Sequence, residues 1–283
     1  VSTATVTVAA GTGGTTADAA RTMVLTTGLN TGSAFAGGSG DDTFDGSTSN
    51  SLNTGDVLVG GAGTDTLSAT LNGTTAAPNV SGVEILNLTV LTTQATVSMA
   101  NVTGVTTVNN VGSTANLTLS NVGTVPTTLG INTNSQSTTL NFTSAAVAGT
   151  ADRLTVNLDG VSAGSAVSLG LVSGATGTIE TVELVSGSVA NVLGAISGAA
   201  VGSTLAISGG QDLEIQGTLG GTITNISAGN ATGALTFATG ANDTTVTTGS
   251  GNDSVTTGAG NDTVSLGAGN DTITSGAGRD NIN

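Results

Sequence analysis

Aspartates recur at a fixed spacing near the end of this chain, and carboxylates arranged in this way can bind metal ions. From Thr248 to Asn283 the sequence repeats every nine residues, as TGSGNDSVT, TGAGNDTVS, LGAGNDTIT and SGAGRDNIN. Each repeat holds one aspartate, and an aliphatic residue follows two places later. The four aspartates are Asp253, Asp262, Asp271 and Asp280. A short period with fixed glycine and aspartate is typical of a coil that repeats a metal site.

Each repeat divides into a turn and a strand that would position its aspartate. The Gly-x-Gly-Asn-Asp part suits a tight turn, because glycine adopts positive φ without a steric clash. The x-aliphatic-x part predicts a three-residue strand whose middle side chain points inward. Two nonapeptide units then make one flattened coil. Such coils would stack about 4.8 Å apart, with the aliphatic side chains filling a thin interior.

In this stack Asp253 lies one coil from Asp271, and Asp262 lies one coil from Asp280. Two carboxylates about 5 Å apart repel by about 1 kcal/mol in water and about 3 kcal/mol at an effective dielectric constant of 20. Calcium would relieve this repulsion, since it binds carboxylate and main-chain oxygens together. Zinc and copper are disfavoured because the chain has no cysteine and no histidine. A single Gly-Asn-Asp is explained as a turn, but four copies in phase favour calcium.

The same consensus occurs twice more, at residues 37–45 and 60–68. These six repeats resemble the RTX family, whose nonapeptide binds calcium. The resemblance implies several Ca²⁺ ions, held by the sixth-position aspartate and by main-chain carbonyls of the turns. The aspartates so implied are Asp42, Asp65, Asp253, Asp262, Asp271 and Asp280. The implied carbonyls belong to Gly249, Ser250, Gly251, Asn252, Gly258, Ala259, Gly260, Asn261, Gly267, Ala268, Gly269 and Asn270.

Two departures from the RTX pattern are visible. The first position of the four C-terminal repeats is Thr248, Thr257, Leu266 or Ser275 instead of glycine. The preceding segment, residues 240–243, is one residue short of the pattern. Asp243 is therefore left out of the implied ligands.

The order of motifs in residues 37–90 resembles the calcium-dependent surface-layer proteins of the Caulobacter type. There a nonapeptide is followed by residues 53–58, a second nonapeptide and residues 81–88. This resemblance implies a structural, non-enzymatic component of an extracellular bacterial surface layer or surface filament, which assembles with its own copies through calcium. It implies type I secretion and a cell-surface anchor outside this stretch of sequence. The alternatives are an RTX adhesin that binds a surface or glycan, and the calcium-binding tail of a secreted enzyme or toxin.

Composition excludes several classes of partner. The chain has 283 residues, 18 acidic and 3 basic, for a formal charge of −15. Nucleic acid and anionic membrane are disfavoured, because both bind clusters of Lys and Arg, and no apolar run is long enough for membrane insertion. Without calcium the charge favours an open chain. The sequence begins without Met and stops directly at its fourth C-terminal repeat, so we expect it to be part of a longer polypeptide.

The middle of the chain predicts further strands. Short alternating runs of β-branched and polar residues are separated by Gly, Asn and Ser. Residues 80–83 align with residues 102–105, and this offset is one coil of a parallel β-solenoid. A leucine-rich repeat, or a β-sandwich for part of this region, remains open. A charged fraction of 7% and a mean hydropathy of +0.28 argue against disorder.

The predicted fold is therefore an all-β parallel β-solenoid, or β-roll, with RTX turns. We divide it into an N-terminal segment with two RTX-like turns (1–70), a Thr/Ser/Gly-rich solenoid (71–238) and an RTX β-roll (239–283), truncated at its C-terminal end. Residues 17–22 suggest a helical turn. Residues 160–164 match the Gly-x-Ser-x-Gly nucleophile motif, but no histidine exists to complete a triad. Glu180 and Glu183 are expected at solvated positions on opposite faces of a strand.

Overall fold

Alternation of apolar and polar residues builds the strands of this chain. In β14 (Arg153–Asp159), for example, Leu154, Val156 and Leu158 are fully buried, whereas Thr155 and Asn157 between them face outward. β-Branched and leucine side chains at alternate positions suit one buried face of a strand. The computed structural model describes residues 6–8, 18–133 and 136–283.

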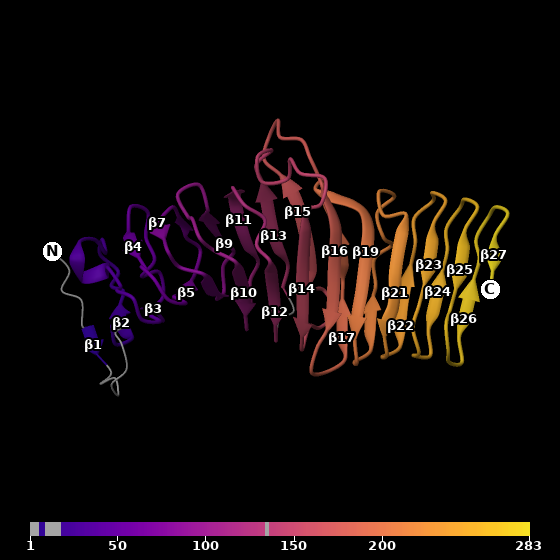
Figure 1. Cartoon of the computed structure of the whole chain (residues 1–283), viewed down its shortest axis with the longest axis horizontal. Helices are drawn as coiled ribbons and strands as arrows, with labels where there is room; N and C mark the ends of the chain where they lie inside the picture. The colour runs from indigo at the N-terminus through magenta and orange to yellow at the C-terminus, as the bar shows by residue number, and fades with distance from the viewer. Residues whose placement is uncertain (1–5, 9–17, 134–135) are drawn as a thin grey trace.

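The strands stack side by side along one axis, as Figure 1 shows from β1 near the N-terminus to β27 near the C-terminus. Successive strands of a sheet are parallel, except for β1 and β2, which are antiparallel. A chain that turns repeatedly and places each strand beside its equivalent one coil earlier is a parallel β-solenoid. The predicted all-β solenoid is confirmed. Over the described residues the leucine-rich repeat and the β-sandwich are excluded.

One sheet runs the whole length of the stack. Its strands, in order, are β1 (Val6–Val8), β2 (Arg21–Val24), β3 (Thr43–Gly46), β5 (Thr66–Leu71), β8 (Ile85–Val90), β10 (Thr107–Val111), β12 (Thr128–Asn132), β14, β16 (Ile179–Ser186), β19 (Val201–Gly209), β21 (Asn225–Ala231), β23 (Thr245–Thr247), β25 (Thr263–Ser265) and β27 (Asn281–Ile282). It passes through all three segments of the predicted division, whose boundaries remain predictions.

Shorter sheets cover the other side. One contains β18 (Ala195–Ser197), β15 (Ala166–Leu171), β13 (Thr138–Phe142), β11 (Leu117–Val122), β9 (Ala95–Ser98) and β6 (Thr75–Ala76). Another contains β17 (Asn191–Leu193), β20 (Leu213–Ile215), β22 (Leu235–Ala238), β24 (Ser254–Thr256) and β26 (Thr272–Thr274). A pair is formed by β4 (Val57–Val59) and β7 (Asn79–Ser81). The core lies between these sheets and the long one.

Inward side chains form continuous columns along the axis. Leu86 pairs with Val108, Val108 with Leu129, and Leu129 with Val156, and all four are buried. The step from Leu86 to Val108 equals the offset between residues 80–83 and 102–105, so the coil length read from the sequence is confirmed there. Like residues stacked on like residues pack a core without any helix covering the sheet.

The C-terminal coils are smaller and more regular. Val246 pairs with Val264 and Val264 with Ile282 in the long sheet, and Val255 pairs with Ile273 on the other side. Each step is two nonapeptides long, and β23, β24, β25 and β26 have three residues each. The sequence predicted both features.

Helical structure is nearly absent from the described residues. The short 3-10 helix η1 (Ser33–Phe35) is the one helix there, and nothing in those residues forms a helix able to cross a membrane. The helical turn predicted for residues 17–22 is wrong, since Arg21 opens strand β2. Its backbone is extended because Thr22 and Met23 pair with Thr43 and Phe44 of the next coil. Residue 17 lies outside the described residues.

Candidate metal centre

The turns of the C-terminal repeats gather at the two edges of the stack. Residues 248–253 and 266–271 lead from the long sheet to the short one, and residues 257–262 and 275–280 lead back. Turns two repeats apart are therefore neighbours, while the two sets lie at opposite edges. The structure brings the predicted residues 249–253 to residues 267–271, and residues 258–262 to residues 276–280.

Hydrogen bonds link each aspartate to the coil before it. The Asp253 amide donates to Oδ1 of Asp271 (2.9 Å), and the Asp262 amide donates to Oδ1 of Asp280 (3.1 Å). Oδ1 of Asp253 accepts from the Leu235 amide (2.9 Å). The four aspartates thus form two ladders, which is the neighbour relation that the spacing predicts.

The second carboxylate oxygen has no partner in three of the implied ligands. Oδ2 of Asp65, Asp253 and Asp262 is buried and makes no hydrogen bond. The three residues are between 0% and 2% exposed. A buried carboxylate oxygen without a donor carries a large desolvation cost, so each of these oxygens fits the site of a cation.

A separate set of hydrogen bonds, the asparagine ladder, uses the asparagines that precede the aspartates. Oδ1 of Asn252 accepts from the Asn270 amide (2.9 Å), and Oδ1 of Asn261 accepts from the Arg279 amide (3.0 Å). The sequence implied only the main-chain carbonyls of these residues, so this side-chain role was missed. The sequence did carry a signal for this role, because an Asn precedes the Asp in each of the first three C-terminal repeats.

Asp243 belongs to the asparagine ladder. Its Oδ1 accepts from the Asn261 amide (2.7 Å), and the side chain is exposed. Thr244 lies one coil before Asp262, at the position that an aspartate would take in a complete repeat. It donates both its amide (2.8 Å) and its hydroxyl (2.7 Å) to Oδ1 of Asp262. The missing residue in this segment shifts Asp243 one place along the turn.

Glycines bring the main chains of neighbouring turns into close approach. Gly269 (φ +145°) and Gly278 (φ +139°) are left-handed, and a Cβ on either would collide with the carbonyl oxygen of Gly251 or Gly260 in the coil before. The carbonyl of Gly249 accepts from the Ala268 amide (2.9 Å), and that of Gly258 accepts from the Ala277 amide (3.1 Å). These implied carbonyls therefore point along the stack, between one turn and the next.

The two N-terminal aspartates have different surroundings. Oδ1 of Asp42 accepts from the Arg21 amide (2.6 Å) and Oδ2 from the Gly38 amide (2.7 Å), so both oxygens have donors. Oδ1 of Asp65 accepts from the Asp42 amide (2.7 Å), but its Oδ2 has no donor. Asp42 therefore lacks the orphan oxygen that marks Asp65.

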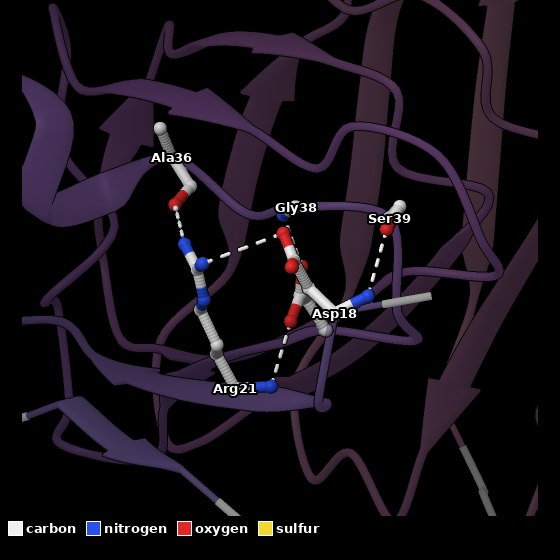
Figure 2. Close-up of polar contacts among 6 residues, drawn as sticks. Asp18, Arg21, Ala36, Gly38 and Ser39 are labelled. Carbon is white, nitrogen blue, oxygen red and sulfur yellow. Dashed lines mark hydrogen bonds and ion pairs between the residues drawn. The ribbon is translucent and has the colours of Figure 1, made fainter. Parts of the chain in front are cut away.

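Arg21 places positive charge at the first turn, as Figure 2 shows. One guanidinium nitrogen lies 3.5 Å from the carbonyl oxygen of Ala36, and another lies 3.7 Å from Oδ2 of Asp18. The Asp18 amide donates to Oγ of Ser39 (2.8 Å), which fastens this segment to the turn. The main chain of Arg21 therefore donates to an implied ligand, and its side chain lies near the same turn.

The charge at Asp65 is not balanced in the same way. Burial raises the pKa of Asp65 above its ordinary value, and the neighbouring acids Asp42, Glu84 and Asp41 raise it further, against the effect of the Asp42 amide. A raised carboxyl pKa means that the surroundings disfavour the ionised form. A bound cation would reverse this preference.

The donors present fit calcium. Over the described residues no three acidic side chains converge into one metal cluster, so any ion at these turns must take main-chain oxygens as well. Calcium accepts carboxylates and carbonyls together in irregular geometry. The orphan oxygens and the close carbonyls supply this mixture, whereas no nitrogen or sulfur ligand is available. Which of the implied residues bind the ion remains a prediction.

Comparison with known proteins agrees with this geometry. The RTX calcium-binding nonapeptide repeat matches the chain in four copies, over residues 35–52, 53–70 and 239–282. The chain carries RTX calcium-binding repeats. Calcium is accordingly its cofactor. Neither curated proteins nor solved structures give a match. The matched residues include all four C-terminal turns and both N-terminal ones, but leave the middle coils unmatched.

The acidic pair of β16, Glu180 and Glu183, lies away from the RTX turns. The sequence-based prediction for this pair was partly wrong. The pairing of β16 with β19 shifts register between Ile179 and Thr181. Glu180 accepts from the Asp152 amide (2.7 Å), and Glu183 contacts Arg153 (2.6 Å). Both side chains are half-buried, so the prediction that they are simply solvated is wrong. They link neighbouring coils instead.

Proposed function

We propose that this RTX protein is a structural component of an extracellular bacterial surface layer or surface filament, folded and assembled through calcium. The observation that carries the proposal is the single sheet that runs from β1 to β27 and is parallel from β2 onward. A stack of this kind is a rod with repeating faces, and repeating faces suit periodic assembly.

Calcium supplies the condition for assembly. The buried orphan oxygens of Asp65, Asp253 and Asp262 disfavour stacking until a cation is bound. Sites of modest affinity fill where calcium is abundant, as it is outside cells. The rod would therefore become rigid after export.

The exterior supports contact between copies. Exposed strand edges of soluble β-proteins are commonly guarded by Lys, and this chain contains no Lys. Val57 and Val59 of β4 are 40% and 41% exposed, and Leu29 is 55% exposed. The Val57 amide donates to the carbonyl of Asn30, which follows Leu29 (2.9 Å), so these exposed side chains come from neighbouring segments. We call Leu29, Val57 and Val59 together the apolar patch.

We propose a structural rather than a catalytic role. The chain has no His and no Cys, which removes the commonest general base and the thiol nucleophile. Ser162 of the Gly-x-Ser-x-Gly match lies in a turn that closes through the Ser165 amide and the Ser162 carbonyl (3.2 Å). This turn connects β14 with β15 and not a strand with a helix, as the nucleophile motif requires.

The test is electron microscopy of the purified chain in millimolar calcium and in EGTA, paired with circular dichroism. We expect calcium-dependent β-structure together with ordered sheets or filaments. Folding in calcium that leaves only monomers contradicts the assembly proposal. It would be the result expected of an adhesin or of an enzyme tail. Comparing bound calcium in monomers and assemblies then tests bridging, for which assemblies must hold more ions per chain.

A substitution in the apolar patch tests the lateral contact. Val59→Lys should prevent ordered assembly while leaving calcium-dependent folding unchanged, because the side chain is outward. Thr150→Lys, in an exposed loop, is the matched control and should assemble like the parent chain. Equal assembly of the two variants would exclude this patch from the contact.

A further inference from the structure

A cavity lies among the middle coils, beside two turns that the RTX repeats do not include. Residues 99–106 form the turn from β9 to β10, and residues 123–127 form the turn from β11 to β12, one coil later (Figure 1). The two turns are neighbours, because the Thr128 amide donates to the carbonyl of Thr106 (3.1 Å). The cavity beside them has a volume of about 230 Å³. The matched repeats end at residue 70 and resume at residue 239, so this cavity is separate from the calcium turns.

The inner wall of the cavity is made of core side chains. Met99, Val108, Leu119, Val122 and Leu140 line it, and each is between 0% and 6% exposed. Among the described residues that line the cavity none carries a charge, and none holds a buried polar atom without a partner. A water molecule needs about two to four polar partners to stay in a cavity. The inner part of this space therefore suits an apolar molecule better than water.

The two turns leave this space because they carry few inward side chains. Gly104 and Gly123 line the cavity, and a Cβ added to Gly123 would meet no atom within 4 Å. Val102 and Val105 also line it and are only half-buried. The turn of the following coil, residues 143–152, is longer and buries Val147 almost completely. The core is thus better filled at that coil than at this one.

The mouth of the cavity is polar but uncharged. Thr103, Thr106 and Thr124 line it and are exposed. A hydroxyl group both donates and accepts hydrogen bonds, so these side chains can bind a hydroxyl group of a ligand. They offer an ionised group no opposite charge, and the formal charge of −15 on the whole chain disfavours anions further.

We propose that this cavity binds a small uncharged molecule, either a single aromatic ring or a short alkyl alcohol. The apolar part of the ligand contacts Met99, Leu119 and Leu140, and the hydroxyl group of an alcohol lies among the threonines of the mouth. No RTX residue lines the cavity, so the assembly proposed above can fail without affecting this binding.

The volume and the burial of the inner wall limit the ligand. An apolar cavity of about 150 Å³ binds benzene, whereas drug-sized ligands occupy pockets of about 300 Å³ or more. The volume of about 230 Å³ lies between these sizes. A peptide segment or a second copy of the chain would have to displace the two turns to reach the buried inner wall. The occupant is therefore a small molecule.

Methionine signals give a direct test, because the chain has two methionines in different coils. Met99 lines the cavity, whereas Met23 is buried in β2. The calcium-loaded chain, with isotope-labelled methionine methyl groups, is titrated with benzene and followed by NMR. The Met99 signal should shift and saturate while the Met23 signal stays. No saturable shift at Met99, or an equal shift at both methionines, would overturn the proposal.

A variant that fills the cavity tests its position. Val105→Phe enlarges a half-buried lining side chain and should weaken benzene binding at least about tenfold, because the added ring competes for the same space. Val185→Phe adds the same side chain on the outward face of β16 and should bind benzene like the parent chain. Unchanged affinity in Val105→Phe, with a normal circular dichroism spectrum, would exclude this cavity as the site. The methionine titration of the parent chain decides the proposal if Val105→Phe misfolds.

Two further probes test the class of ligand. 1-Hexanol and hexanoate have alkyl chains of the same length, but hexanoate is ionised at neutral pH. Hexanoate should shift the Met99 signal with an affinity at least about tenfold weaker than that of 1-hexanol, since its carboxylate finds no opposite charge at the mouth. Equal affinity, or tighter binding of hexanoate, would overturn the assignment to uncharged ligands.

Discussion

The middle coils and the C-terminal coils share one sheet but are stabilised differently. β14 is seven residues long and buries three aliphatic side chains completely, whereas β25 is three residues long and buries Val264 alone. Burying one such side chain contributes about 1.5–3 kcal/mol. Burial of apolar side chains therefore stabilises the middle coils. The C-terminal coils bury too few apolar side chains, and their turns carry acidic residues.

The hydrogen-bonded ladders of the two regions differ in charge. In the middle, Asn109 donates from Nδ2 to Oδ1 of Asn87 (2.8 Å), a neutral contact between a donor and an acceptor. At the C-terminal turns the stacked groups are carboxylates, and two of them keep a buried oxygen without a donor. Repetition is stable by itself when the stacked side chains are amides. It needs a cation when they are acids.

The largest expected effect is that of calcium removal. At a calcium concentration 100 times its Kd, each site contributes about 2.7 kcal/mol. EGTA should therefore lower hydrogen-exchange protection of residues 245–282 at least about 100-fold, while β14 and β16 change little. Mass spectrometry of exchanged peptides checks this. Equal loss in both regions would mean that the whole stack depends on the ion.

Truncating a core side chain of the middle coils should lower stability whether or not calcium is present. Leu158→Ala removes a completely buried side chain and should lower the free energy of unfolding by about 2–5 kcal/mol. The loss should be the same in calcium and in EGTA. Leu29→Ala, at an exposed position, is the control and should change stability little. Chemical denaturation in both buffers gives the comparison, and a loss seen only in calcium would contradict it.

Neutralising a C-terminal carboxylate should weaken calcium binding without destabilising the calcium-free protein. Asp262→Asn keeps Oδ1 as an acceptor for Thr244 but removes the charge of the orphan oxygen. We expect the calcium midpoint to rise about tenfold, or about 1.4 kcal/mol, with no loss of thermal stability in EGTA. Asp243→Asn, exposed in the asparagine ladder, should leave the midpoint unchanged. A midpoint that moves equally in both variants would assign the effect to net charge.

The smallest effect concerns an ion pair of the middle coils. The hydrogen bond from Arg153 lowers the pKa of Glu183 below its ordinary value, against the effect of burial. The pair therefore stabilises the fold above the ordinary glutamate pKa, and this contribution is lost as pH falls through the lowered pKa. Arg153→Met should cost less than about 1 kcal/mol at neutral pH, because the pair is partly exposed. It should cost nothing in strong acid, as measured by urea denaturation across pH. A cost that persists in acid would indicate lost packing instead.

Much of the site followed from spacing alone. The period of nine places Asp253 beside Asp271 and Asp262 beside Asp280, because two repeats fill one coil. Spacing did not reveal Glu84, which stands outside any nonapeptide and joins the ladder only through the Asp65 amide. Nor did it reveal that Asp42 is already satisfied, since its donor, the Arg21 amide, comes from the coil before.

The sequence by itself determined the fold class, the coil length of the C-terminal repeats and the metal. Alternation defines strands, a fixed period defines coils, and a chain without His or Cys leaves only oxygen ligands. The tertiary structure decided which carboxylate oxygens lack donors, and where carbonyls of one turn meet acids of another. Those facts depend on register between coils of unequal length, and a shift of one residue, as at Asp243, exchanges one ladder for the other.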